Sequence, residues 1–160
     1  MSSFVFFLLP YAFLITPSAD NSSSILLAKQ YHQGFVVKPY WVSEKLDGLR
    51  ALLDGKKLIS KNGYTFSVPT WFTQGFPAVV MEGELWLGRN HYEEISSITS
   101  KSVADARWSN IKLMLFDLPE YADDFNQRYH AMQRLVQATD SPSLSPFKKF
   151  RVITNNDLMA

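Results

Sequence analysis

The segment from Trp41 to Ala51 reads W-V-S-E-K-L-D-G-L-R-A, and the other recognisable features of the chain are arranged around it. Asp47-Gly48 stands between two apolar runs, and such a pair is a strong signal for a hairpin turn. Glycine tolerates a positive φ, and the aspartate carboxylate caps its own turn. The segment therefore predicts strands over 40–46 and 49–53, paired with each other across this turn.

Two cations flank the predicted turn, in the pattern K-x-D-G-x-R. Lys45 and Arg50 are explained either as solvated charges on a hairpin or as a cradle for a triphosphate in which the lysine is a nucleophile. A free lysine has a pKa of about 10.4 and is almost fully protonated at neutral pH. A nucleophilic lysine therefore needs a dry pocket or neighbouring cations, such as an arginine and a nucleotide-bound magnesium.

Two further turn pairs follow at short spacing. Asp54-Gly55 and Asn62-Gly63 enclose a strand that is predicted over 57–61. Short strands joined by such turns indicate an antiparallel meander, because parallel pairing would need long crossover connections.

The clearest strand is predicted over 78–87, where apolar residues alternate with Glu82, Glu84 and Trp86. In a strand, alternate side chains point to the same side, so the two carboxylates share a face. That face is explained either as a solvated surface or as the wall of a cleft. In the second case Glu84 holds a ribose hydroxyl or assists a metal.

The other expected elements follow from periodicity, length and breaker residues. A helix over 123–138 is predicted because apolar residues recur every three or four positions and acidic residues stand at its start. The remaining expectations are a short aromatic helix over 71–76, a helix over 89–99, a strand over 111–118, a Ser/Pro loop over 140–146 and a strand over 147–154.

The composition indicates a single globular domain. The chain has 160 residues, of which 46% are hydrophobic and 14% aromatic, enough for a sizeable core. It has no cysteine, which excludes a disulfide framework, a Cys-ligated zinc site and a cysteine nucleophile. The formal net charge is only +1, whereas strong nucleic-acid binders carry a clear basic excess. A nucleic-acid function therefore requires locally concentrated cations.

Residues 1–20 differ in composition from the rest of the chain. An almost continuous apolar run covers 4–15, followed by small residues and a polar stretch. Such a run is too short to span a bilayer and fits the core of an export signal, although no Lys or Arg precedes it. We therefore expect a signal peptide over 1–20, excluded from the fold, and export to the periplasm of a bacterium without stable membrane insertion. The alternatives for this segment are an extension upstream of the true start of the protein and a membrane-associating tail, and the alternative location is the cytoplasm.

Four motifs occur in order: E-K-L-D-G-L-R at 44–50, S-K-N-G at 60–63, E-G-E-L at 82–85 and L-F-D-L-P at 115–119. Together they resemble the covalent nucleotidyltransferases, namely ATP-dependent DNA ligases, RNA ligases and mRNA capping enzymes. The sequence is most similar to the small exported bacterial ATP-dependent DNA ligases, in which W-V-S-E-K-L-D-G and G-E-L-W-x-G-R are typical. Two positions depart from the family pattern, since Lys61 stands for an arginine and Glu82 for an aspartate.

The resemblance implies an α+β, ATP-grasp-like nucleotidyltransferase (adenylation) domain over 21–160, with antiparallel sheets and flanking helices. It implies that Lys45 attacks the α-phosphate of ATP to form lysyl-AMP, with Mg²⁺ offsetting the triphosphate charge. The other implied roles are Glu84 at the ribose and secondarily at a metal, Phe116 against adenine, Arg50 and Lys61 at ribose or phosphate, and Asp47 in support of the turn and the later chemistry.

The resemblance further implies transfer of AMP to the 5′-phosphate of nicked double-stranded DNA and sealing by the 3′-hydroxyl. The expected protein is a monomer that acts in DNA repair, recombination or replication. Two downstream family motifs and the OB-fold domain that clamps DNA are expected to be absent, as in a C-terminally truncated ligase. The alternatives are a catalytically dead or weak nucleotide-binding remnant, an RNA ligase or capping-type enzyme, and a plain α+β domain with coincidental motifs.

Overall fold

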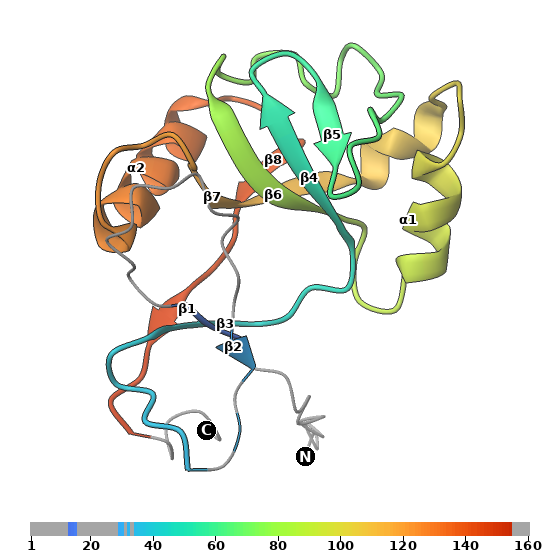
Figure 1. Cartoon of the computed structure of the whole chain (residues 1–160). Coiled ribbons are helices and arrows are strands. Elements are labelled where there is room, and N and C mark those ends of the chain that lie inside the picture. Colours follow the sequence, from blue (N-terminus) through green and yellow to red (C-terminus); the bar gives the residue numbers. More distant parts are fainter. Residues whose placement is uncertain (1–12, 16–28, 31, 33, 155–160) are drawn as a thin grey trace, which may run out of the picture. The chain divides into compact units, whose positions relative to one another are not determined.

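The computed structural model describes residues 13–15, 29–30, 32 and 34–154, which belong to two compact units (Figure 1). One unit contains a four-stranded sheet of order β2-β1-β3-β9, and the other a five-stranded sheet of order β5-β4-β6-β7-β8. Within these described residues, no helix combines the length and the apolar character needed to cross a membrane.

The smaller sheet is antiparallel, with β3 paired to both β1 and β9. Its pairing is reinforced from the side chains, because the guanidinium of Arg151 lies 4.7 Å from the centroid of the Trp41 ring. The strands are β1 (Phe13–Ile15), β2 (Lys29–Gln30), β3 (Trp41–Ser43) and β9 (Phe150–Arg151).

Strand β1 lies inside the segment that was expected to be an export signal. Leu14 is the register partner of Val42. The three residues of β1 therefore take part in the sheet and do not stand outside the fold. The rest of residues 1–20 falls outside the described part of the chain. The export signal therefore stays a prediction.

The larger sheet holds most of the predicted strands. The α-helices of this unit are α1 (Tyr92–Thr99) and α2 (Phe125–Ala138), and a short 3-10 helix covers Ala106–Asn110. The strands are β4 (Leu49–Asp54), β5 (Leu58–Ser60), β6 (Val80–Trp86), β7 (Lys112–Asp117) and β8 (Leu144–Pro146).

The pairing of β7 with β8 is parallel, which corrects the prediction of purely antiparallel sheets and of a loop over 140–146. The connection between the two strands is α2, which contacts both of them (Figure 1). Asp124 caps the start of α2, because its carboxylate accepts a 2.9 Å hydrogen bond from the backbone N–H of Gln127. The predicted helix supplies the long crossover that parallel pairing requires.

One face of the larger sheet forms the core. Phe72 is fully buried, with its ring 4.9 Å from that of Trp108 in an edge-on arrangement. The predicted aromatic helix over 71–76 is wrong, since this segment is a series of turns. Core side chains from the sheet and α1 are Ala51, Leu53, Met81, Leu85, Ile95, Ile98, Leu113 and Leu115.

The predicted hairpin across Asp47-Gly48 is also wrong. Strand β3 pairs with β1 and β9, whereas β4 pairs with β5 and β6. Gly48 is not among the glycines with positive φ. A Cβ atom at Gly48 would lie 2.3 Å from the backbone oxygen of Leu85 and 2.9 Å from Cγ of Glu84. Close approach to β6, not turn geometry, is what requires glycine here.

The two later turns are confirmed. Gly55 has φ 91° and Gly63 has φ 85°, and β5, which lies between these two turns, pairs antiparallel with β4. At the first turn, the Asp54 carboxylate accepts hydrogen bonds from the backbone N–H groups of Lys57 and Lys56, which lowers the pKa of that carboxyl.

Candidate functional site

The strand register brings three motif side chains onto one face of the larger sheet. Arg50 is the direct partner of Glu84, and Leu52 that of Glu82. Residues opposite each other in an antiparallel pair lie on the same side. The predicted shared face of the two carboxylates is therefore confirmed, and it also carries the guanidinium of Arg50.

Arg50 and Glu82 form an ion pair with 2.6 Å between Nε and Oε1. Their side chains are 19% and 7% exposed, respectively. Charged hydrogen bonds that are shielded from water are stronger than exposed ones. Glu82 therefore fixes the direction in which Arg50 projects from the sheet.

We expect Glu82→Gln to lower stability by roughly 2 kcal/mol, because it removes a charged partner from a half-buried guanidinium. The melting temperature should fall by about 5 °C for a chain of this size. Thermal unfolding measures the change, with Glu120→Gln as the matched control at an exposed position. Equal melting temperatures of the two variants would contradict the role assigned to the ion pair.

Phe116 reaches the same face through an irregularity in β7. Glu82 is the register partner of Asp117 and Gly83 that of Leu115, so Phe116 is an extra residue in a β-bulge. Bulges redirect side chains next to functional sites. Here the guanidinium carbon of Arg50 lies 5.1 Å from the centroid of the Phe116 ring.

The residue after Phe116 has a structural contact of its own. The Asp117 carboxylate accepts a 2.9 Å hydrogen bond from Nε of Arg128 on α2. Asp117 is almost fully buried, and Arg128 also donates to the backbone oxygen of Asp123. This pair fastens the start of α2 to the end of β7, directly beside Phe116.

A groove of about 570 Å³, lined mostly by residues with polar side chains, lies beside the start of β4. Arg50 and Lys61 both line it, so the structure brings these two predicted phosphate ligands to one groove. The lining contains a third cation, Lys101, and no carboxylate among its described residues. The remaining lining residues are Gly48, Leu49, Ser60, Asn62, Tyr64, Thr65, Phe66, Ser67, Ser96, Thr99, Ser100 and Ser102.

The S-K-N-G segment forms one edge of this groove. Ser60 closes the turn, because its backbone N–H donates to Tyr64 and its hydroxyl accepts a hydrogen bond from the backbone N–H of Tyr64. This turn leaves Lys61 exposed on the groove.

Lys45 and Asp47 lie at the boundary between the two units, and both are exposed. Lys45 ends a segment of the smaller unit, and Leu46 begins the larger one. Lys45 therefore belongs to a different unit from Arg50, Glu84 and Phe116.

No group of three or more His, Asp or Glu side chains suited to a metal ion occurs in the described part of the chain. Mg²⁺ is commonly held by one or two carboxylates together with substrate phosphates and water. Glu84, on the sheet face, is the candidate for such a contact.

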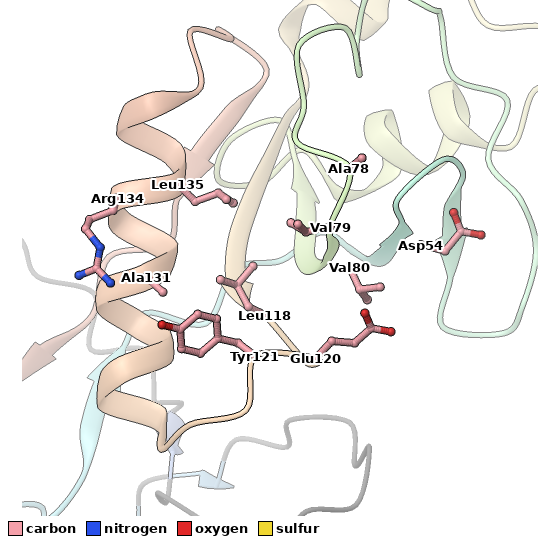
Figure 2. Close-up of a pocket in the computed structure, with 10 residues that line it drawn as sticks. All are labelled: Asp54, Ala78, Val79, Val80, Leu118, Glu120, Tyr121, Ala131, Arg134 and Leu135. Carbon is pink, nitrogen blue, oxygen red and sulfur yellow. The ribbon is translucent and has the colours of Figure 1, made fainter.

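A second cavity, of about 800 Å³, is lined by one residue of the four motifs, Leu118, and by Asp54 of the Asp54-Gly55 turn. It lies between α2 and the ends of β4, β6 and β7, and its walls are largely apolar (Figure 2). Its charged lining residues are Asp54, Glu120 and Arg134.

Two residues of the site have no role that the sequence alone indicates. Alternation places Glu82 on the correct face but does not identify it as the partner of Arg50, a contact between residues 32 positions apart. Lys101 gives no signal, since it follows α1 in a stretch without a motif.

Comparison with known proteins identifies relatives for this arrangement. No protein-family model matches the chain. A DNA ligase of Haemophilus influenzae is 36% identical over 116 residues, which are 72% of this chain and 42% of that protein. A solved structure from a structure–function study of Lig E DNA ligases, described as binding DNA with a minimal scaffold, is 37% identical. It has a TM-score of 0.76 and covers 83% of this chain and 53% of its own.

The chain spans about half the length of these relatives. The aligned part includes most of the chain, and the likeness extends to both sequence and fold. With Arg50, Glu84 and Phe116 gathered on one sheet face, and with this similarity in sequence and fold, the chain is a DNA ligase-like protein.

Proposed function

We propose that this chain carries the adenylation chemistry of an ATP-dependent DNA ligase. The observation that carries the proposal is the convergence of Arg50, Glu84 and Phe116 on one sheet face, with Arg50 fixed by Glu82. An aromatic ring, a carboxylate and a guanidinium on one surface supply a stacking partner, a hydroxyl acceptor and an anion ligand. These are the groups needed to hold a nucleoside triphosphate.

In the proposed reaction, the Lys45 amine attacks the α-phosphorus of ATP. A P–N bond forms, the bond to the pyrophosphate oxygen breaks, and the amine loses a proton to yield lysyl-AMP. Arg50 and Lys61 hold ribose or phosphate oxygens, Glu84 accepts from a ribose hydroxyl and Phe116 packs on adenine. Asp47 supports the segment that carries the nucleophile. Glu84, together with the phosphates, would hold Mg²⁺, and the ion would offset the triphosphate charge.

The second half of the proposal concerns DNA. AMP passes to the 5′-phosphate of a nicked duplex, and the 3′-hydroxyl then displaces it to seal the strand. The similarity to DNA ligases and the groove with three cations support this substrate. A small net charge is compatible with such binding when the cations are concentrated in one place. We further propose action as a monomer in DNA repair, recombination or replication, after export.

The test is incubation of the chain with magnesium and ATP labelled at the α-phosphate, followed by denaturation. The proposal expects label that stays on the protein and is released as AMP in acid. A chain that is folded by circular dichroism and takes up no label would overturn the proposal and leave a nucleotide-binding remnant. Label from GTP instead of ATP would favour a capping-type enzyme.

A second test addresses the base. We expect Phe116→Leu to raise KM for ATP about tenfold in the labelling assay, because the aromatic stack contributes on the order of 1.4 kcal/mol. Phe116→Tyr, which retains the ring, should keep KM within about twofold. Equal KM values for the leucine variant and the wild type would place adenine elsewhere.

A further inference from the structure

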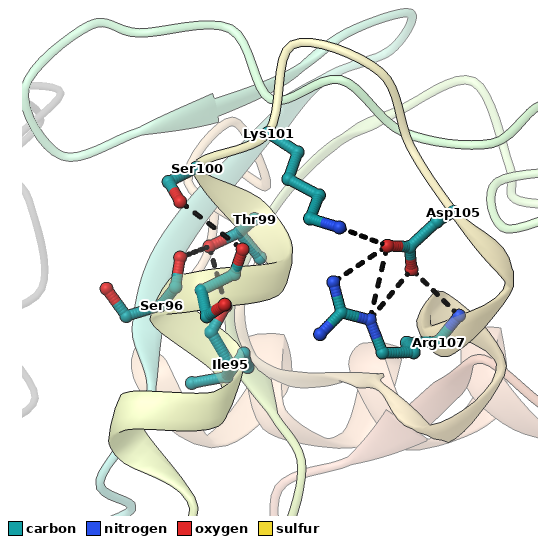
Figure 3. A network of polar contacts seen from close by, with 8 residues as sticks. Ile95, Ser96, Thr99, Ser100, Lys101, Asp105 and Arg107 are labelled. Atoms are coloured by element: carbon teal, nitrogen blue, oxygen red, sulfur yellow. Dashed lines mark hydrogen bonds and ion pairs between the residues drawn. The ribbon is translucent and has the colours of Figure 1, made fainter.

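The loop after α1 contains a lysine whose ammonium shares a carboxylate with an arginine. Lys101 Nζ lies 2.8 Å from Oδ2 of Asp105, and Nη2 of Arg107 lies 2.7 Å from the same oxygen (Figure 3). The cluster therefore has two positive charges and one negative charge. A further carboxylate, that of Glu94, acts on Arg107 from nearby and, after that of Asp105, helps to raise the pKa of its guanidinium.

Arg107 alone is enough to hold Asp105. Its Nε lies 3.2 Å from both carboxylate oxygens, and its backbone N–H donates to Oδ1 at the start of the 3-10 helix. The Arg107 guanidinium, and after it the Lys101 ammonium, hold the pKa of the Asp105 carboxyl well below its usual range. Asp105 thus keeps its charge, its cap and its main partner when Lys101 moves away.

The backbone of this loop is anchored on both sides of Lys101. The backbone N–H of Ser100 donates to the backbone oxygen of Ser96 at 3.1 Å, and the Ser67 hydroxyl donates to the backbone oxygen of Ser102 at 2.8 Å. The Lys101 side chain, by contrast, is 46% exposed, and exposed ion pairs exchange readily because they contribute little. A fixed backbone with an exchangeable ammonium suits the capture of an anion.

The groove beside this loop offers no competing carboxylate among its described lining residues. Of its three cations, Arg50 and Lys61 are assigned to ATP in the proposed function, so Lys101 is the groove cation that has no ligand assigned there. Tyr64, which is 74% exposed, lines the same groove and presents an aromatic surface. Cations interleaved with an aromatic ring favour a nucleic acid over a small inorganic anion.

We propose that Lys101 binds a backbone phosphate of duplex DNA in this groove, and that Asp105 holds its ammonium until the phosphate replaces it. The proposal rests on the proposed function, because the duplex is the substrate of that function. Asp105 is a positioning residue in this scheme. It acts on DNA only through Lys101.

The experiment is equilibrium binding of a fluorescent nicked duplex to the full chain across a series of salt concentrations. Loss of one phosphate contact should reduce the slope of log K against log salt by about 0.9 in Lys101→Ala. Lys56→Ala, which removes an exposed lysine outside the groove, should keep the wild-type slope. Asp105→Asn retains an oxygen to cap Arg107 and should bind the duplex several-fold more tightly, because Lys101 is released.

The double variant decides whether Asp105 acts through Lys101. In the Lys101→Ala background, Asp105→Asn should no longer raise the affinity for the duplex. A gain that came only from the loss of a negative charge would persist in that background. The proposal is overturned by a persisting gain, by a wild-type slope in Lys101→Ala, by weaker binding of Asp105→Asn, or by no duplex binding at low salt. Labelling by ATP needs no DNA, so a labelled chain that fails these tests overturns this inference alone.

Discussion

Gly48→Ala should destabilise the chain by about 3 kcal/mol or more. Among the substitutions considered, this is the largest expected loss of stability, although the change removes no functional group. The added Cβ would overlap the backbone oxygen of Leu85 at 2.3 Å, and this backbone oxygen lies within the β4–β6 pairing. A flexible side chain would yield at little cost, but a paired strand has to shift as a unit. The shift would also move Arg50 relative to Glu84, so labelling by ATP should fall together with stability.

The comparison that isolates the cause is Gly75→Ala. Gly75 has φ 81°, and a Cβ added there would meet no atom within 4 Å, so its substitution tests left-handed backbone strain without a clash. That strain costs about 1–2 kcal/mol. Denaturant unfolding of both variants gives the ranking. If Gly48→Ala is no more destabilising than Gly75→Ala, the close approach of β4 to β6 does not limit this position.

The same glycine shows where prediction from the sequence fails. An Asp-Gly pair between apolar runs has the same local appearance whether the chain turns back on itself or runs on closely beside another strand. Only the pairing of β4 with β6 distinguishes the two cases. In that pairing the residue opposite Arg50 is Glu84, which is far along the chain. The prediction at Asp54-Gly55 succeeded because there the partners are close in the chain and the turn geometry alone determines the pairing.

Long-range contacts also explain the other errors. Leu144–Pro146 has the composition of a loop because Ser and Pro dominate it, yet it pairs with β7 once α2 brings it back. On the sheet face, alternation was enough to place Glu82 and Glu84 together, since it depends only on strand geometry. The ion pair of Arg50 and the approach of Lys101 to the groove depend on tertiary packing, so no local pattern could indicate them.

Lys45→Ala should abolish covalent labelling by ATP, so that the labelling rate falls by at least about a thousandfold. No other group replaces a nucleophile whose nitrogen becomes part of the intermediate. Lys45 is exposed, so its truncation should change stability by less than about 0.5 kcal/mol. Activity and stability are thereby separated, in contrast to Gly48→Ala, where both should fall.

Two matched variants make the Lys45 result specific. Lys38→Ala removes another exposed lysine of the same unit and should label like the wild type. Lys45→Arg keeps the positive charge but has no amine that can lose its proton at neutral pH, so it should bind ATP and remain unlabelled. Label that survives in folded Lys45→Ala would mean that a different residue is the nucleophile. Arg50, Glu84 and Phe116 would then hold a nucleotide for a reaction in which this lysine has no part.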